Sequence, residues 1–288
     1  MMNSYFFKKE KVIEILNEIQ IKLKDKTKVL EKAFDADYKK WEVKIELEQL
    51  MKIIENVKKQ EYLPKFSKQE IIDGLGKIAL VNTTNPYIIF NFVLSCVYTN
   101  NKACIILENK FFASNVAIIE LVKKVLEDLK YDSNLIEYKE VLKKEEIIQK
   151  QDEYDLIYYV GNKEEYLDFI KRIHIDSKFE NFGEIYVYVD NNELFKDKLL
   201  EMDKLAYKNE LKVHYYDSNL ENSVHLINKG NNINKISIIF TDNIENAYEF
   251  IKKIKAEKIY VNEKPEAYLM YNIKQNNLIF KKVIALKK

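Results

Sequence analysis

The chain has 288 residues, of which 47% are hydrophobic, so it is long enough to bury a core without disulfides or metal ions. Its 47 basic and 46 acidic residues are interleaved without a basic block, which argues against nucleic acid as a partner. The apolar runs are too short to span a bilayer, and the first residues show no signal-peptide pattern. We therefore expect a cytoplasmic protein without membrane segments.

The two cysteines, Cys96 and Cys104, stand in apolar surroundings and lack metal-ligand or CxxC spacing. A free cysteine in such surroundings is usually a small core residue. The only arginine is Arg172, so an arginine clamp for phosphate or carboxylate is nearly unavailable. We predict no metal site.

Apolar residues at spacings of three and four predict helices near the start, over residues 12–23 and 42–57. Short apolar runs then alternate with helical stretches. The runs cover residues 78–81, 103–107, 135–138, 156–160 and 185–189. A helix of about ten residues is expected to end at residue 98, and another covers 116–129 with Ser114 or Asn115 as its N-cap. Further helices are expected over 141–149, 164–173 and 193–208.

Residues 217–235 are polar and rich in asparagine, which predicts a loop. A last unit follows, with an apolar run at 236–240, a helix over 244–255 and a run at 258–261, and residues 278–286 read as a strand. Short buried strands that alternate with helices indicate an α/β fold with a parallel sheet flanked by helices.

Five segments resemble the aldehyde dehydrogenase superfamily, in family order, over roughly residues 75–265. Residues 78–86 (IALVNTTNP) are similar to the first cofactor-domain strand and turn of CoA-acylating aldehyde dehydrogenases. Residues 183–190 (GEIYVYVD) most resemble the strand that enters the catalytic domain of γ-glutamyl phosphate reductases. The other matches are 101–106 (NKACII), 155–162 (DLIYYVGN), and 238–242 (IIFTD) with 259–262 (IYVN).

The resemblance implies a cysteine nucleophile, NAD(P) as the hydride carrier, and an asparagine that stabilises the oxyanion. Asn85 matches that asparagine. The position of the cysteine falls on His214, and no cysteine follows Cys104. Much of the segment that family members carry between the cysteine and the late unit is also missing here.

The residues that the resemblance places at the cofactor are Thr83, Thr84, Asn85, Gly161 and Asn162. Two features oppose binding. Leu107 or Glu108 stands where non-acylating members have a ribose-holding lysine, and Glu164 and Glu165 begin the helix that would face the pyrophosphate. We therefore assign no cofactor, and NAD(P) is the one that an active form would use.

Each candidate residue also has a structural reading. Asn85 is either the oxyanion donor or a turn residue before proline. His214 is either a general base or ligand, or an incidental surface or loop residue. Gly161 serves the strand-to-helix turn whether or not a nucleotide binds.

We expect three parts: an N-terminal helical segment (1–73), a Rossmann-like cofactor-type domain (74–190), and a shortened catalytic-domain remnant (191–288). The final strand resembles the one with which the family pairs subunits. Since an exposed strand edge seeks a partner, we expect a homodimer or a hetero-oligomer with a full-length dehydrogenase.

The first functional hypothesis is a non-catalytic pseudoenzyme that acts as a binding or scaffold protein. The alternative is an NAD(P)-dependent oxidoreductase or acyl reductase whose altered chemistry uses Asn85, His214 and Glu180. A third reading, an unrelated Rossmann-like nucleotide-binding protein, is tested by the strand order and by the place of the last strand.

Overall fold

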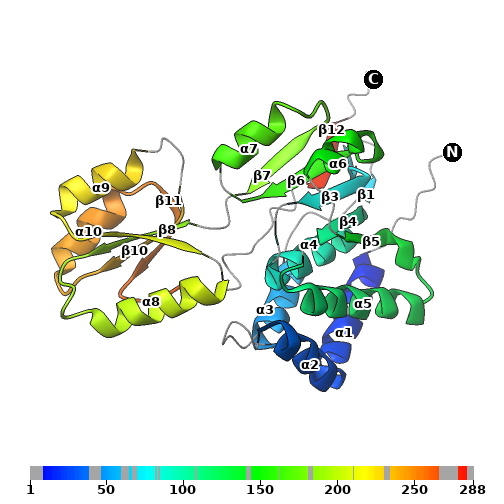
Figure 1. The fold of residues 1–288 in the computed structure, drawn as a ribbon, viewed down its shortest axis with the longest axis horizontal. Coiled ribbons are helices and arrows are strands. Elements are labelled where there is room, and N and C mark those ends of the chain that lie inside the picture. Colours follow the sequence, from blue (N-terminus) through cyan, green and yellow to red (C-terminus); the bar gives the residue numbers. More distant parts are fainter. Residues whose placement is uncertain are drawn as a thin grey trace. The chain divides into compact units, whose positions relative to one another are not determined.

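The computed structural model describes residues 9–38, 47–59, 65–66, 70–81, 83, 85–107, 109–140, 144–161, 163–180, 184–209, 211–229, 234–265 and 278–283. The chain divides into two compact units (Figure 1). The first comprises Met1–Glu180 with Tyr271–Lys288, and the second comprises Asn181–Met270. The second unit is thus inserted between two parts of the first.

The first unit begins with three helices, α1 (Lys9–Asp25), α2 (Thr27–Tyr38) and α3 (Leu47–Lys58). Apolar residues at helical spacing on α1 are buried, as the sequence pattern predicts. Two strands then follow, β1 (Lys65–Phe66) and β2 (Glu70–Gly74), so residues 1–73 are not helical throughout. Strand β12 (Ile279–Val283) pairs antiparallel with β2 and completes a small sheet in the order β1-β2-β12.

A five-stranded parallel sheet forms the centre of the first unit, in the order β5-β4-β3-β6-β7. Its strands are β3 (Lys77–Val81), β4 (Lys102–Leu107), β5 (Ile136–Glu140), β6 (Leu156–Val160) and β7 (Ser177–Glu180). Helices α4 (Pro86–Tyr98) and α5 (Phe112–Asp128) cover one face, and α6 (Lys144–Gln149) and α7 (Lys163–Ile170) cover the other (Figure 1). The predicted parallel sheet with helices on both faces is therefore confirmed.

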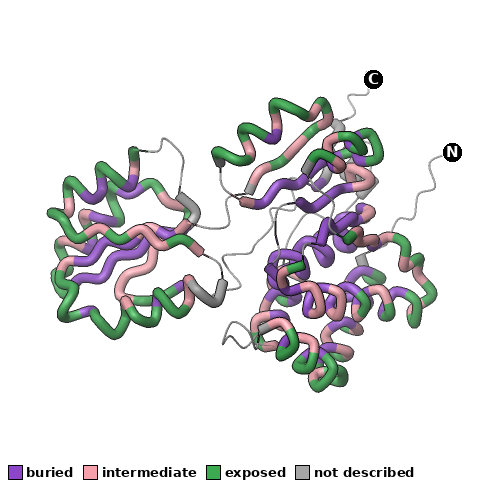
Figure 2. Tube along the Cα trace, viewed as in Figure 1, coloured by how far each residue is buried: buried purple, intermediate pink, exposed green. Residues whose placement is uncertain are grey.

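Every residue of α4 is buried (Figure 2), because this helix is enclosed between the sheet and helices α1, α3 and α5. In its interior the Ser95 hydroxyl donates to Asn91 Oδ1 at 3.0 Å, whereas Asn91 Nδ2 is buried without a hydrogen-bond partner among the described residues. An apolar helix of this length is a core element, and within the described residues no helix is long and apolar enough to cross a bilayer.

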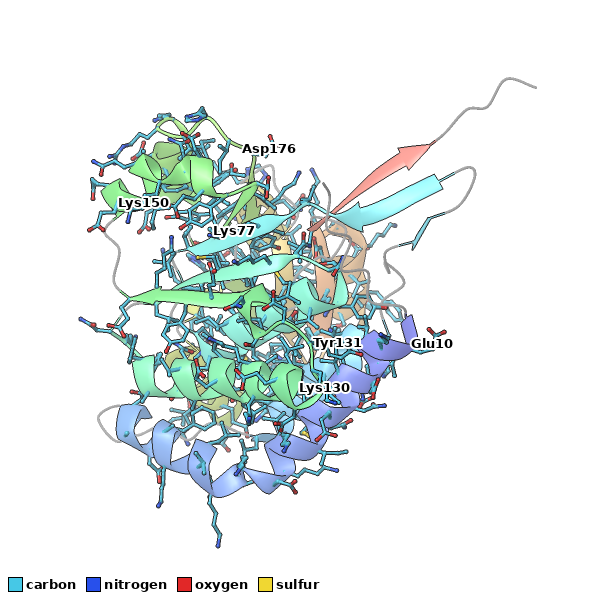
Figure 3. The ribbon with its side chains drawn as sticks, turned by 90° about the vertical axis from the view of Figure 1, so that its right-hand side faces the viewer. Glu10, Lys77, Lys130, Tyr131, Lys150 and Asp176 are labelled. Carbon is cyan, nitrogen blue, oxygen red and sulfur yellow. The ribbon has the colours of Figure 1, made fainter. Side chains whose placement is uncertain are left out.

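The start of β3 shows why one glycine is needed. Gly76 has a φ of 120°, and a Cβ atom there would collide with the carboxylate of Asp155. That carboxylate accepts the backbone N–H of Lys77 at 2.7 Å. Lys77, labelled in Figure 3, is the first residue of β3. A side chain at position 76 would therefore disturb the junction of β3 with the loop before β6.

The N-cap predicted for α5 is wrong. The helix begins at Phe112, before Ser114 and Asn115, and Phe111 at its N-cap position makes no side-chain capping bond. Asp37 of α2 supplies the cap instead: its carboxylate accepts the backbone N–H of Ser114 at 2.6 Å and the Ser114 hydroxyl at 2.7 Å. The first turn of α5 is thereby held by another helix.

The second unit has a four-stranded parallel sheet in the order β11-β10-β8-β9. Its strands are β8 (Glu184–Val189), β9 (Lys212–Tyr216), β10 (Asn234–Phe240) and β11 (Ala256–Val261). Helix α8 (Lys196–Asn209) lies on one face, and α9 (Leu220–Asn228) and α10 (Ile244–Lys253) lie on the other (Figure 1).

Helix α9 corrects the loop predicted over residues 217–235. The Asn219 side chain accepts the backbone N–H of Asn222 and caps the helix, while Val224 and Ile227 are buried beneath it. Asparagine-rich segments usually predict loops, but Asn219 is the N-cap of a short helix with an apolar face.

Candidate functional site

Three of the predicted cofactor residues meet at one edge of the five-stranded sheet. Thr83 and Asn85 follow β3, and Gly161 follows β6, its parallel neighbour. The chain passes from β3 to β4 and β5 on one side, whereas β6 and β7 lie on the other. The order reverses between β3 and β6, and open α/β sheets bind ligands at such a point, outside the carboxyl ends of the strands. Thr84 and Asn162 lie outside the described residues.

Asn85 is buried and starts α4. Its Oδ1 accepts the backbone N–H of Tyr87 at 2.9 Å and that of Ile88 at 3.4 Å. Its own N–H lies 3.3 Å from the hydroxyl oxygen of Thr83. The side-chain oxygen therefore satisfies helix donors that would otherwise face a ligand. Only the amide nitrogen is chemically suited to donate to an oxyanion.

The turn after β6 has a glycine requirement of its own. Gly161 has a φ of 151°, and α7 follows with Glu164 and Glu165 exposed in its first turn. The Glu165 carboxylate also accepts the hydroxyl of Tyr159 at 3.3 Å. Two carboxylates at a helix N-terminus oppose a pyrophosphate there, so these residues do not fit the phosphates of a dinucleotide.

Leu107 is the last residue of β4 and is fully buried. It has no polar atom on its side chain to hold a ribose hydroxyl. Glu108 lies outside the described residues.

His214 belongs to the second unit, where it lies in the middle of β9 rather than on a loop. Its ring stacks on Tyr186 of β8, with centroids 4.9 Å apart and an interplanar angle of 9°. Its Nε2 lies 3.7 Å from Glu184 Oε1, and its side chain is 26% exposed. The contacts of this histidine are thus with the neighbouring strand.

Both cysteines are fully buried, Cys96 on α4 and Cys104 on β4. Burial raises the pKa of each thiol, so the thiolate that a nucleophile needs is disfavoured. The Cys104 Sγ lies 3.9 Å from the hydroxyl of Tyr154. Within the described residues, no three His, Cys, Asp or Glu side chains gather as metal ligands.

The second sheet also reverses its order, between β8 and β10, and Asp190 follows β8 at that point. The hydroxyls of Tyr188 and Thr241 donate to its carboxylate, and Asn246 Nδ2 of α10 lies 3.0 Å from Oδ2. Burial would raise the pKa of Asp190, but the hydrogen bonds from Asn246, Thr241 and Tyr188 hold it below its ordinary value. This carboxylate joins β8, β10 and α10, and the sequence pattern did not predict it.

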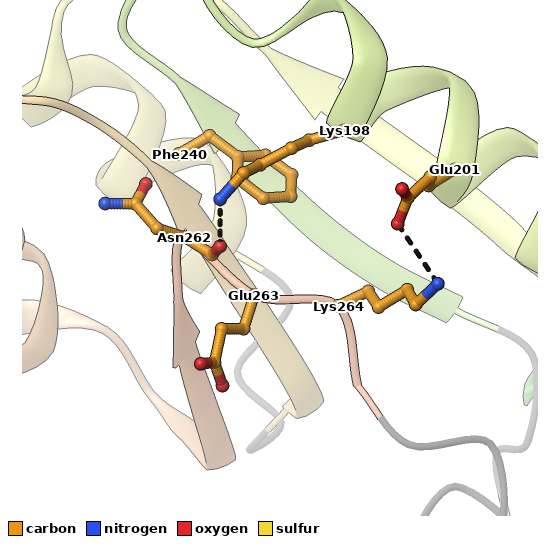
Figure 4. A pocket seen from close by; sticks show the side chains of 6 residues that line it. All are labelled: Lys198, Glu201, Phe240, Asn262, Glu263 and Lys264. Carbon is orange, nitrogen blue, oxygen red and sulfur yellow. Dashed lines mark hydrogen bonds and ion pairs between the residues drawn. The ribbon is translucent and has the colours of Figure 1, made fainter.

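A pocket of about 350 Å³ lies near the carboxyl ends of β10 and β11, beside α8 (Figure 4). Lys198 Nζ donates to the backbone oxygen of Asn262 and lies 5.8 Å from the centroid of the Phe240 ring. Lys264 Nζ pairs with the Glu201 carboxylate at 3.0 Å. The volume of this pocket is at the low end of the range for small-molecule sites. Lys198 and Lys264, which line it, both contact other groups of the protein.

Comparison with known proteins gives matches in structure only. No protein-family model matches the chain, and no curated protein matches its sequence. A γ-glutamyl phosphate reductase from Thermotoga maritima aligns over 98% of this chain and 94% of its own, with a TM-score of 0.61 and 13% identity.

Two further solved structures have a TM-score of 0.71 over 98% of this chain. A glyceraldehyde-3-phosphate dehydrogenase from Methanocaldococcus jannaschii, complexed with NADP, is 12% identical and covered over 90% of its length. A probable aldehyde dehydrogenase from Listeria monocytogenes is 11% identical and covered over 92%. Likeness at such identities establishes the fold alone. The chain therefore has the α/β fold of the aldehyde dehydrogenase superfamily, as its five sequence matches predict.

Proposed function

We propose that this protein is a non-catalytic relative of the aldehyde dehydrogenases that acts as a cytoplasmic binding or scaffold component. The observation that carries the proposal is the burial of both cysteine thiols. Cys96 and Cys104 are both in the core, and no cysteine follows them in the sequence. Chemistry of this family needs an accessible thiolate.

His214 is a poor substitute for that thiolate. Imidazole cannot form a stable thioester, and this ring is stacked on Tyr186 within the second sheet. The acidic first turn of α7 further disfavours the pyrophosphate of a nucleotide cofactor.

The partner that we propose is another protein chain, either a second copy or a full-length dehydrogenase. In support, β12 is the last strand of the β1-β2-β12 sheet within the described residues, and edge strands recruit further strands. Light scattering at micromolar concentration would argue against a homodimer if it returned the monomer mass.

One observation favours the alternative, an NAD(P)-dependent oxidoreductase or acyl reductase with altered chemistry. Thr83, Asn85 and Gly161 lie together where the first sheet reverses its strand order, which is the usual ligand position of such folds. This alternative requires that a nucleotide bind despite the carboxylates of α7.

Thermal unfolding with and without millimolar NAD+, NADP+, NADH, NADPH or acetyl-CoA distinguishes the non-catalytic proposal from the oxidoreductase alternative. A ligand at about a hundred times its dissociation constant stabilises the folded state by roughly 2.7 kcal/mol, which raises the melting temperature by several degrees. We expect no shift with any of the five. A clear shift, together with reduction of the nicotinamide by an aldehyde, would contradict the non-catalytic proposal.

A matched pair of variants would show whether any shift in melting temperature depends on Asn85. Asn85→Ser keeps a short side-chain oxygen to cap α4 but removes the amide nitrogen. Asn243→Ser makes the same exchange at the N-cap of α10, in the other unit. A nucleotide shift lost only in Asn85→Ser would assign the amide to ligand binding.

A further inference from the structure

Helix α10 exposes an unusual row of large apolar side chains. Ile244 is 69% exposed, Tyr248 68% and Ile251 44%. Their spacing of four and three residues places them on one side of the helix, which we call the α10 stripe. The same helix buries Ala247 and Phe250 against the sheet. Single exposed apolar residues are common, but three on one helix side indicate a contact surface.

The α10 stripe lies on the flank of α10 that faces away from its neighbour, α9. Asn246 points toward the centre of the sheet, where its amide reaches Asp190 at the end of β8. Residues two positions apart point to different sides of a helix, so Ile244 and Tyr248 lie on the opposite flank. That flank is on the side of β11, the last strand of this sheet in the described part of the chain.

The charges along α10 favour a second copy of the same helix as the occupant. The acidic residue Glu245 lies in its first turn, and the basic residues Lys252 and Lys253 lie in its last turn. A parallel copy would place like charges side by side. An antiparallel copy, related by a two-fold axis near Tyr248, brings Glu245 of one chain beside Lys252 of the other.

We propose that two copies of this protein associate through their α10 helices, packed antiparallel along the α10 stripe. Tyr248 lies at the centre of this contact, where an aromatic side chain contributes most. The stripe is small beside the roughly 800 Å² per partner of a standard interface, so we expect association in the micromolar range or weaker. The proposal depends neither on nucleotide binding nor on strand β12.

Sedimentation velocity of the full chain, from about 10 μM to about 1 mM, tests this contact. We expect a concentration-dependent dimer. Tyr248→Glu places two carboxylates at the centre of the interface and should weaken the dimer at least tenfold. Leu200→Glu is the matched control, because Leu200 is 49% exposed on α8, on the other face of the same sheet.

Charge reversal tests the antiparallel orientation. Glu245→Lys alone should weaken the dimer, and adding Lys252→Glu should restore it, because the ion pair is re-formed with its signs exchanged. Circular dichroism checks that each variant is folded. A monomer at all concentrations, a dimer that survives Tyr248→Glu, or a double variant no stronger than the single one would overturn the proposal. Each of these results is independent of the nucleotide experiment.

Discussion

The carboxylate of Asp37 caps a helix that begins far from it in the sequence, since it accepts both the backbone N–H and the hydroxyl of Ser114. This contact fixes α2 to the first turn of α5. It performs the work of a local N-cap, although Phe111 at the capping position provides no such bond.

We expect Asp37→Ala to lower the free energy of unfolding by about 1–2 kcal/mol, because the first N–H groups of α5 lose their acceptor. Asp35→Ala is the control, since Asp35 is exposed on the same helix. Urea denaturation compares the two variants, and hydrogen exchange at the Ser114 amide localises the effect. Equal losses in both variants would argue against the remote cap.

Asp190→Asn should destabilise the second unit by about 2 kcal/mol near pH 7, the range for hydrogen bonds to a charged group. The folded pKa of Asp190 lies below its ordinary value of 3.8. Its carboxylate therefore contributes fully above that value, and the contribution is lost as the pH falls through the folded pKa. Urea unfolding at neutral and acidic pH should show the difference between variant and wild type shrinking in acid. A difference that does not change with pH would contradict this role.

Gly76→Ala should cost more than the roughly 1 kcal/mol by which alanine and glycine usually differ. Alanine disfavours a φ of 120°, and its methyl group would collide with the Asp155 carboxylate. Thermal unfolding of Gly76→Ala alone, and of Gly76→Ala with Asp155→Gly, separates the two causes. Partial recovery in the double variant would confirm the collision, whereas no recovery would leave backbone strain as the cause.

Neither cysteine should react with an aromatic disulfide reagent while the protein is folded. Both thiols are fully buried, and burial raises the pKa of each. Absorbance of the released thiolate measures the reaction, and the urea-unfolded chain, in which both thiols should react, is the control. A thiol that reacts rapidly in the native state would undermine the non-catalytic proposal.

The strands in the interior of a sheet are the easiest to predict from the sequence, because they have nearly unbroken apolar runs. Strands β3, β4 and β6 are buried on both faces, so their sequences are apolar at nearly every position. Strands β7 and β9 lie at sheet edges and mix polar with apolar residues, which hides them in the sequence. Helix α9 is hidden in the sequence because its N-cap, Asn219, resembles the asparagines of a loop.

The candidate site was predictable only in part, for a similar reason. Thr83, Asn85 and Gly161 follow recognisable strands, and parallel pairing of β3 with β6 brings them together. The carboxylate junction at Asp190 depends on Thr241 and Asn246, whose positions are set by the pairing of β8 with β10. A contact between residues so far apart has no local signal in one sequence.

The pairing of β2 with β12 determines when the protein can finish folding during synthesis. Residues 70–74 leave the ribosome long before their partners, residues 279–283. All of Asn181–Met270 is translated in between, so the inserted unit can fold while β2 still lacks this neighbour. Until then β2 offers an unpaired backbone edge, and a slow ribosome would prolong its exposure to other nascent chains.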